Sequence, residues 1–191
     1  MNILLVRKKD CPYSQNAMDF LLQTDHKVGV IECEKRFDQF PKNLGWIPDV
    51  VFSFKNYMVL PKSMTNTTIC INFHPAPPEH PGSCSTNWAI YNNDTHFGVT
   101  AHFMNDLIDN GLIFRVKRFP IQVGCTLDEL TVRADTECLK LFKEVVKDMT
   151  CTWKGKPRRG KDLDLLIKNA NTPQEKLRVE RATVREKSVV R

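Results

Sequence analysis

The sequence predicts a domain of the α/β class, with helices flanking a mostly parallel central sheet that becomes mixed later in the chain. Short apolar runs at residues 3–6, 27–31 and 50–54 have the length of buried strands. A stretch with helical spacing separates the first two runs, which fits a right-handed parallel unit. A long amphipathic stretch after residue 126 supplies a further covering helix.

The other elements follow in order along the chain. Ser14 is a candidate N-cap for the first helix, whose apolar face holds Ala17, Met18, Phe20, Leu21 and Leu22. Residues 57–60 form an apolar patch without regular structure. Further predicted elements are strands over 68–73, 97–104 and 112–120 and a short helix over 86–91. Thr126 and Glu129 have the spacing of a capping box, which predicts a helix from there to about Met149.

Charge divides the chain into two parts. The 191 residues carry a net charge of +6, but Lys and Arg nearly balance Asp and Glu over residues 1–150. Residues 151–191 hold 12 Lys and Arg against 5 Asp and Glu. We therefore predict a catalytic domain over 1–150 and a basic C-terminal extension over 151–191. Such an extension suits an anionic ligand such as a nucleotide, a phosphate or RNA, or it is a solvated tail.

Composition also limits the cellular setting. A hydrophobic content of 41% and a charged content of 26% are ordinary for a globular protein. Apolar runs are all well below the roughly 20 residues of a membrane helix, and the N-terminal run is too short for a signal peptide. Seven cysteines without pair-like spacing favour reduced thiols. We expect a cytoplasmic protein without a membrane partner.

One candidate site lies where a predicted strand meets a proline-rich loop, over residues 71–82. Asn72 and His74 alternate, so their side chains leave the same face of an extended segment. Asp109, in the later Asp-Asn-Gly segment, approaches His74 if the two strands are neighbours, and a carboxylate there would orient the imidazole. The alternative is purely structural, with a stiff loop at 75–82 and a turn at 109–111.

The sequence is compatible with two other chemistries. Cys11-Pro12-Tyr13-Ser14 opens the first helix, where a thiol pKa is lowered, and it resembles a glutaredoxin motif with serine replacing the second cysteine. A loop cysteine beside a proline explains the same segment. Metal binding would draw on the histidines His74, His80, His96 and His102. Their spacing lacks the tight pairs of zinc sites, so we predict no metal.

Several motifs in order resemble the folate-dependent formyltransferases, which transfer a formyl group from N10-formyltetrahydrofolate to an amine. The matching segments are Asn72-Phe73-His74-Pro75, Pro78-Glu79-His80-Pro81-Gly82, Trp88-Ala89-Ile90, Gly98-Val99-Thr100 and Asp109-Asn110-Gly111. Upstream, Met58-Val59-Leu60-Pro61 is similar to the family's Ile-Leu-Pro stretch. The resemblance covers residues 50–115 well and the N-terminal strand–helix–strand more loosely. The resemblance implies that the chain has a Rossmann-like formyltransferase fold and that it is an enzyme, an N-formyltransferase.

The resemblance also implies residue roles. Asn72, His74 and Asp109 would be catalytic. The folate co-substrate would contact Met58, Val59, Leu60, Met104, Asn105 and Asp106. The acceptor would contact Lys8, Lys9 and His80. No metal is implied.

Three branches of the family differ in the acceptor amine. Glycinamide ribonucleotide formyltransferases have a Gly-rich loop where this chain has residues 7–12 without glycine. Methionyl-tRNA formyltransferases carry a second domain, for which we see no room after residue 150. The segments 153–157, 161–166 and 180–183 look like the tail of the enzymes that formylate nucleotide-linked amino sugars, and methionyl-tRNA enzymes share part of it. We therefore expect a dTDP- or UDP-4-amino-4,6-dideoxyhexose, such as dTDP-4-amino-4,6-dideoxyglucose, as acceptor.

The sequence also allows other functions. A formyltetrahydrofolate deformylase would use the same three residues with water as nucleophile, although those enzymes carry an additional N-terminal domain. A non-catalytic folate or nucleotide binder and a thiol redox protein using Cys11 are further alternatives. We expect a homodimer and no nucleic-acid partner.

Overall fold

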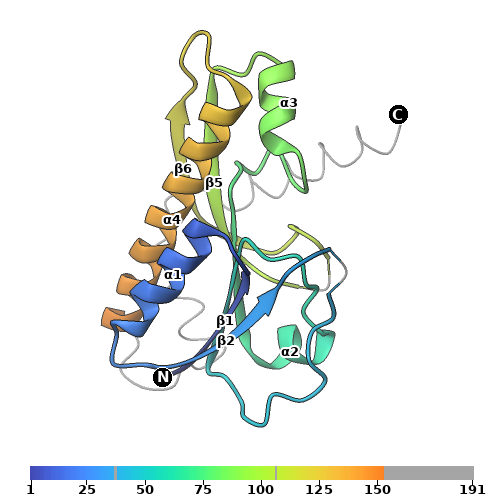
Figure 1. Ribbon diagram of the computed structural model, residues 1–191, viewed down its shortest axis with the longest axis vertical. Coiled ribbons are helices and arrows are strands. Elements are labelled where there is room, and N and C mark those ends of the chain that lie inside the picture. The colour runs from blue at the N-terminus through green and yellow to red at the C-terminus, as the bar shows by residue number, and fades with distance from the viewer. Residues whose placement is uncertain (37, 106, 153–191) are drawn as a thin grey trace.

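The structure, a computed structural model, describes residues 1–36, 38–105 and 107–152. These residues form a six-stranded sheet in the order β2-β1-β3-β4-β5-β6 (Figure 1). The strands are β1 (Asn2–Lys8), β2 (Lys27–Cys33), β3 (Val50–Phe54), β4 (Ile69–His74), β5 (His96–Phe103) and β6 (Ile113–Pro120). The helices are α1 (Pro12–Leu22), α2 (Lys62–Thr67), α3 (Ser85–Tyr91) and α4 (Leu127–Thr152).

The sheet changes from parallel to antiparallel at one position. β1 pairs in parallel with β2 and β3, and β3 pairs in parallel with β4. β5 runs antiparallel to both β4 and β6. This confirms the predicted α/β class with a sheet that is parallel first and mixed later, and the change falls between β4 and β5, beside the candidate site.

Helices α1 and α4 lie side by side over one face of the sheet (Figure 1). Four rings form the centre of this cluster: Phe52, Phe54, Phe73 and Phe142. The rings of Phe73 on β4 and Phe142 on α4 are 4.9 Å apart in an edge-to-face arrangement, which aromatic pairs favour. Because strand side chains alternate, Ile71 and Phe73 point into this cluster, whereas Asn72 and His74 point to the opposite face.

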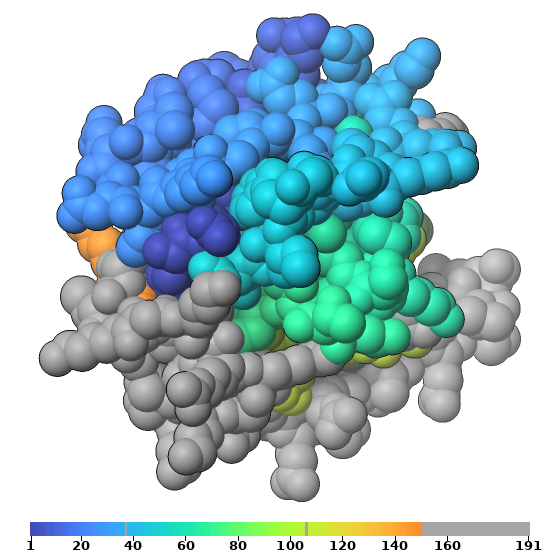
Figure 2. All heavy atoms as spheres, turned by 90° about the horizontal axis from the view of Figure 1, so that it is seen from below, coloured from blue at the N-terminus to red at the C-terminus, as the bar shows by residue number. Residues whose placement is uncertain are grey.

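A smaller cluster lies on that opposite face. Its buried members are Leu4, Val6, Cys33, Val51, Met58, Leu60 and Cys70. Partly buried residues of the irregular segment before β3, including Phe40 and Trp46, pack against it. Seen from below, the described surface is coloured mainly blue to green, the colours of the N-terminal half of the chain (Figure 2). The segment between β2 and β3 covers part of the face on which the polar strand residues lie.

Most predicted elements are present within a residue or two. The capping box is confirmed, because the Thr126 N–H donates to Glu129 Oε2 at 2.8 Å and the Glu129 N–H donates to Thr126 Oγ1 at 3.3 Å. The N-cap prediction for Ser14 was wrong. Cys11 occupies the N-cap and Pro12 the first helical position, where its missing N–H costs nothing. Ser14 is buried one turn further on and donates to the Lys8 carbonyl.

Helix α2 was not predicted, because it has only six residues, which are mostly polar and form no apolar face. Helix α4 continues to Thr152, past the predicted domain boundary at residue 150. The C-terminal extension and the tail segments similar to the sugar branch lie outside the described residues, so the domain division stays a prediction. Within the described ranges, none of the helices has the length and apolar character to cross a bilayer.

Candidate active site

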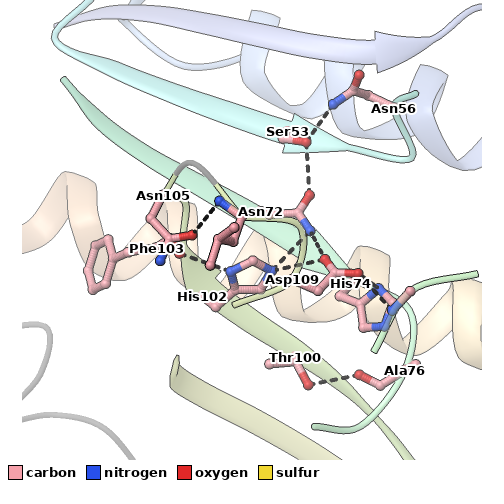
Figure 3. A network of polar contacts seen from close by, with 12 residues as sticks. Ser53, Asn56, Asn72, His74, Ala76, Thr100, His102, Phe103, Asn105 and Asp109 are labelled. Carbon is pink, nitrogen blue, oxygen red and sulfur yellow. Dashed lines mark hydrogen bonds and ion pairs between the residues drawn. The ribbon is translucent and has the colours of Figure 1, made fainter. Parts of the chain in front are cut away.

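Asn72 lies near the end of β4, and its amide is oriented by a chain of hydrogen bonds. Ser53, its neighbour in β3, donates from Oγ to Asn72 Oδ1 at 2.8 Å. Asn56 donates to the same Ser53 Oγ at 2.7 Å, and the Met58 N–H donates to Asn56 Oδ1. Since Asn72 Oδ1 accepts from Ser53, its Nδ2 group must point toward the other side, where Asp109 lies (Figure 3).

Asp109 contacts both polar residues of β4, and its approach to His74 was predicted for the case, found here, that the two strands are neighbours. Its Oδ1 accepts from Asn72 Nδ2 at 3.2 Å, and its Oδ2 lies 3.7 Å from His74 Nδ1. The Gly82 N–H, at the end of the proline-rich loop, donates to Oδ2 at 2.9 Å. Asp109 has a positive φ of 48°, a left-handed conformation that aspartate tolerates better than most residues. The carboxylate therefore links β4, the proline-rich loop and the loop after β5.

Gly111 shows why this loop can return to the sheet. A Cβ atom at this position would lie 1.5 Å from the carbonyl oxygen of Phe103. Only a residue without a side chain fits so close to the backbone. The Asp-Asn-Gly segment is thus more than a turn, because its glycine allows the close approach that brings Asp109 over Asn72.

The Asp109 carboxylate is held in its charged form. Burial of the carboxyl opposes ionisation, but a hydrogen bond with His102, electrostatic attraction to the imidazoles of His74 and His102 and the Gly82 N–H outweigh burial. Together they hold the pKa of Asp109 well below its ordinary value of 3.8. A negative charge is therefore fixed beside the imidazole of His74 at neutral pH.

His74 is buried, with both ring nitrogens directed at protein acceptors. Its Nε2 lies 2.9 Å from the carbonyl oxygen of His80, which also accepts from Ser85 Oγ at 3.1 Å. A carbonyl only accepts, so Nε2 carries a proton, and a second proton on Nδ1 would face Asp109. The geometry favours a protonated His74 ring lying between the carboxylate and the proline-rich loop.

His102 belongs to the same network, and sequence reasoning considered it only as a metal ligand. It lies opposite Asn72 in the β4–β5 pairing, and its Nε2 is 3.1 Å from Asn72 Nδ2 and 3.4 Å from Asp109 Oδ1. Its Nδ1 is 2.9 Å from the Phe103 carbonyl oxygen, which fixes a proton on Nδ1. The residue spacing alone contains no signal for this contact, because it depends on the antiparallel register.

A cleft of about 1180 Å³ opens over this network. One group of its lining residues is apolar and includes Phe40, Met58, Leu60, Met104, Leu107 and Ile108. Another group is polar and includes Lys55, Ser85, Thr86, Thr131 and Asp135. Asn72, His74 and Asp109 line the same cleft. A flat apolar ligand and a polar ligand would thus meet at the three predicted catalytic residues.

Most of the predicted folate contacts line the cleft, namely Met58, Val59, Leu60, Met104 and Asn105. Asp106 lies outside the described residues. Of the predicted acceptor contacts, Lys8 lines the cleft and donates to the Tyr57 hydroxyl at 3.1 Å. Lys9 instead pairs with Glu34 on the surface, and the His80 side chain pairs with Asp94 at 2.6 Å. Neither of these side chains is part of the described cleft lining.

Other predicted chemistries have weaker structural settings. Cys11 is buried at the start of α1 and is not part of the described lining of the cleft. Across the residues that the structure describes, no group of three His, Cys, Asp or Glu side chains is arranged to hold a metal ion. The polar network around Asp109 is therefore the strongest candidate site in the described part of the chain.

The α/β sheet has an Asn/His/Asp network at its parallel-to-antiparallel boundary, which is compatible with the family that the sequence motifs resemble. Residues 45–146, more than half of the chain, match the family model described as formyl transferase. The chain belongs to the formyl transferase family.

Curated relatives are similar over part of their length. A methionyl-tRNA formyltransferase of Sorangium cellulosum is 27% identical over 124 residues, covering 61% of this chain and 39% of that protein. A phosphoribosylglycinamide formyltransferase of Escherichia coli is 31% identical over 77 residues, covering 40% of this chain and 36% of that protein. The chain thus spans well under half the length of these two relatives.

Solved structures share the fold. An N-formyltransferase from Helicobacter canadensis, in complex with folinic acid and dTDP-3-aminofucose, has a TM-score of 0.63 at 20% identity. The match covers 85% of this chain and 69% of that protein. A 4-N formyltransferase from Francisella tularensis has a TM-score of 0.67 at 19% identity, covering 84% and 74% of the two chains. At such identities the likeness establishes the Rossmann-like formyltransferase fold.

Proposed function

We propose that this chain is an N-formyltransferase that moves the formyl group of N10-formyltetrahydrofolate to the amino group of a nucleotide-linked amino sugar. The observation that carries the proposal is the Asp109 carboxylate, which contacts both Asn72 and His74 at the floor of a two-sided cleft. Membership of the formyl transferase family supports formyl transfer as the chemistry.

The reaction forms one C–N bond and breaks another. The lone pair of the acceptor amine attacks the formyl carbon, and the carbonyl electron pair moves onto oxygen. When the tetrahedral intermediate collapses, the bond to N10 of the folate breaks and the proton lost by the amine passes to N10. An anionic oxygen and a migrating proton are therefore the two features that the site has to serve.

The three polar residues suit these two tasks. Asn72 can donate an amide N–H to the developing oxyanion, and the positive charge of the protonated His74 ring can stabilise the same oxygen. One donor of this kind is typically worth about 3 kcal/mol in the transition state. The Asp109 carboxylate, ionised because its pKa is lowered, keeps His74 cationic and can relay the proton between the two nitrogens.

The walls of the cleft divide naturally between two substrates. The apolar side, with Met58, Leu60 and Met104, suits the flat pterin ring, and the irregular backbone there offers N–H and C=O groups to its edge. Val59, Asn105 and Asp106 remain part of the proposed folate site. The polar side faces the acceptor, and Lys8, Lys9 and His80 remain proposed contacts to the nucleotide diphosphate.

Two acceptors compete for the polar side. Sugar N-formyltransferases recur among the structurally similar proteins, which supports dTDP-4-amino-4,6-dideoxyglucose or a related dTDP- or UDP-sugar. Methionyl-tRNA is the second candidate, because several curated relatives are methionyl-tRNA formyltransferases. Glycinamide ribonucleotide is less favoured, since the β1–α1 connection lacks the glycines that cradle its phosphate.

Incubation with N10-formyltetrahydrofolate and a panel of acceptors tests the proposal. The panel holds dTDP- and UDP-4-amino-4,6-dideoxyglucose, glycinamide ribonucleotide and initiator Met-tRNA. Formation of the formylated sugar nucleotide is expected. Transfer only to glycinamide ribonucleotide or Met-tRNA would reject nucleotide-linked amino sugars as the acceptor class. Release of formate from the formyl folate without transfer to any acceptor would identify a deformylase. Light scattering on the same sample tests the predicted homodimer.

A further inference from the structure

An ion pair on the polar wall of the cleft has no role in the chemistry described above. Lys55 follows β3 directly, and its Nζ lies 2.7 and 2.8 Å from the two carboxylate oxygens of Asp135 on α4. Both residues line the cleft, and Asp135 is a buried residue. The pair thus joins the end of a central strand to the covering helix at the edge of the proposed acceptor site.

A contribution to the stability of the fold is a weak explanation for the presence of this ion pair. Taking two charges out of water costs several kcal/mol per ion, and apolar replacements are often as stable. Lys55 also has a positive φ of 51°, a left-handed conformation that is unfavourable for a lysine. Backbone strain of this kind concentrates at functional sites. Two unfavourable features at one position in a cleft indicate a binding role.

Two threonines line the same cleft as the pair. Thr131 lies one helical turn before Asp135 and lines the cleft, with its Oγ1 3.3 Å from Oγ1 of Thr86 on α3. An ammonium has three N–H donors, of which two are directed at Asp135, and each carboxylate oxygen accepts more than one hydrogen bond. A ligand hydroxyl, which both donates and accepts, can therefore bridge Lys55 and Asp135.

We infer that Lys55 and Asp135 form a subsite that binds a hydroxyl of the acceptor's sugar ring, and so selects a polyhydroxylated amine. This inference rests on the proposed function only for the identity of the ligand. The subsite lies at the carboxyl end of β3, on the edge of the sheet where ligands of open α/β sheets bind. A purely apolar amine would offer no hydrogen bond to Lys55 or Asp135 and would still shield the two charges from water.

Binding and turnover test the subsite separately. Calorimetry with dTDP-4-amino-4,6-dideoxyglucose should show affinity about tenfold to a hundredfold weaker for Asp135→Asn than for the wild-type chain, since hydrogen bonds to charged groups are lost. Affinity for N10-formyltetrahydrofolate should stay within twofold. Asp148→Asn is the matched control, because it breaks another strand-to-α4 ion pair, with Arg115, away from the cleft.

The double variant Lys55→Met/Asp135→Leu covers the case in which the single variant does not fold, because it leaves no buried charge unpaired. It should fold, bind the folate and lose affinity for the sugar nucleotide. Wild-type affinity for the sugar nucleotide in either folded variant, or no binding by the wild-type chain, would overturn the subsite. Binding by the wild-type chain without formyl transfer would instead count against the proposed function, and the variants would still decide the subsite.

Discussion

Asn72 and Asp109 are joined by a 3.2 Å hydrogen bond although 37 positions separate them in the chain. The amide leaves a parallel strand, and the carboxylate comes from the loop after the antiparallel strand beside it. The hydrogen-bond chain through Ser53 fixes which end of the amide faces the carboxylate (Figure 3). The proposed catalysis depends on this orientation, because only the NH₂ end can donate to an oxyanion.

Ser53→Ala should lower kcat of formyl transfer roughly tenfold while leaving the KM for folate within about threefold. The substitution removes the donor to Asn72 Oδ1, so the amide loses its fixed orientation, and the lost hydrogen bond corresponds to about 1 kcal/mol or more. Steady-state kinetics measure the effect. Ser63→Ala, an exposed position on α2, is the control. Equal kcat in both variants would show that Ser53 does not position Asn72.

Asp94→Asn should lower kcat while leaving the KM for N10-formyltetrahydrofolate within about threefold. Asp94 pairs with the His80 side chain, and the His80 carbonyl accepts from His74 Nε2, so the pair positions the proline-rich loop against the ring. Small displacements of catalytic groups cost large factors in rate, and we expect roughly tenfold. A pH–rate profile adds a second readout, because weaker holding of the protonated His74 ring would shift the alkaline limb, where the ring loses its proton. An unchanged kcat and profile would assign Asp94 a local structural role only.

The free energy of unfolding should fall in acid partly through Asp109. Its pKa is lowered in the folded protein, so below the ordinary value of 3.8 the unfolded chain binds a proton that the folded protein does not. Its contribution is complete above about pH 5 and is lost as pH falls toward the folded-state pKa. In urea titrations from pH 7 to 3, Asp109→Asn should therefore lose less stability than the wild-type chain. A slope equal to that of the exposed control Asp128→Asn would contradict this.

Gly111→Ala should impair both folding and transfer. The added methyl group would collide with the Phe103 carbonyl, so the loop that carries Asp109 has to move away from the sheet. We expect a loss of stability in thermal unfolding and a rate reduction of at least tenfold in the folded fraction. Gly124→Ala is a control at an open turn, where no atom lies within 4 Å of the added Cβ but φ is positive. Smaller effects at Gly111 than at Gly124 would contradict the close-approach argument.

Sequence reasoning reached most of the fold because strand alternation and helical spacing are local properties. The alternation of Asn72 and His74 predicted that both side chains leave the same face of the strand, and both line the cleft. Helix α2 was missed because it is short and polar and has no apolar face. The start of α1 at Pro12 was missed because Ser14, two residues later, belongs to a residue type that commonly caps helices. These errors did not affect the site.

The candidate site was predicted only in part, because several contacts depend on tertiary register. His102 joins Asn72 and Asp109 through the antiparallel pairing of β4 and β5. Lys55 reaches Asp135 across 80 positions of sequence. Neither contact has a signature in residue spacing. Lys9 and His80, chosen as acceptor contacts, have side chains paired with Glu34 and Asp94, and their proposed role awaits measurement.

Single-turnover formyl transfer by Asp109→Asn tests the central claim most directly. The assay uses N10-formyltetrahydrofolate and dTDP-4-amino-4,6-dideoxyglucose at saturating concentration, with folate binding measured on the same preparation. The account predicts a rate at least about a hundredfold below that of the wild-type chain, with folate affinity within twofold, because the near-isosteric amide cannot hold His74 cationic or relay the proton. A rate within about threefold of wild type would contradict the assignment of Asp109 to the chemistry.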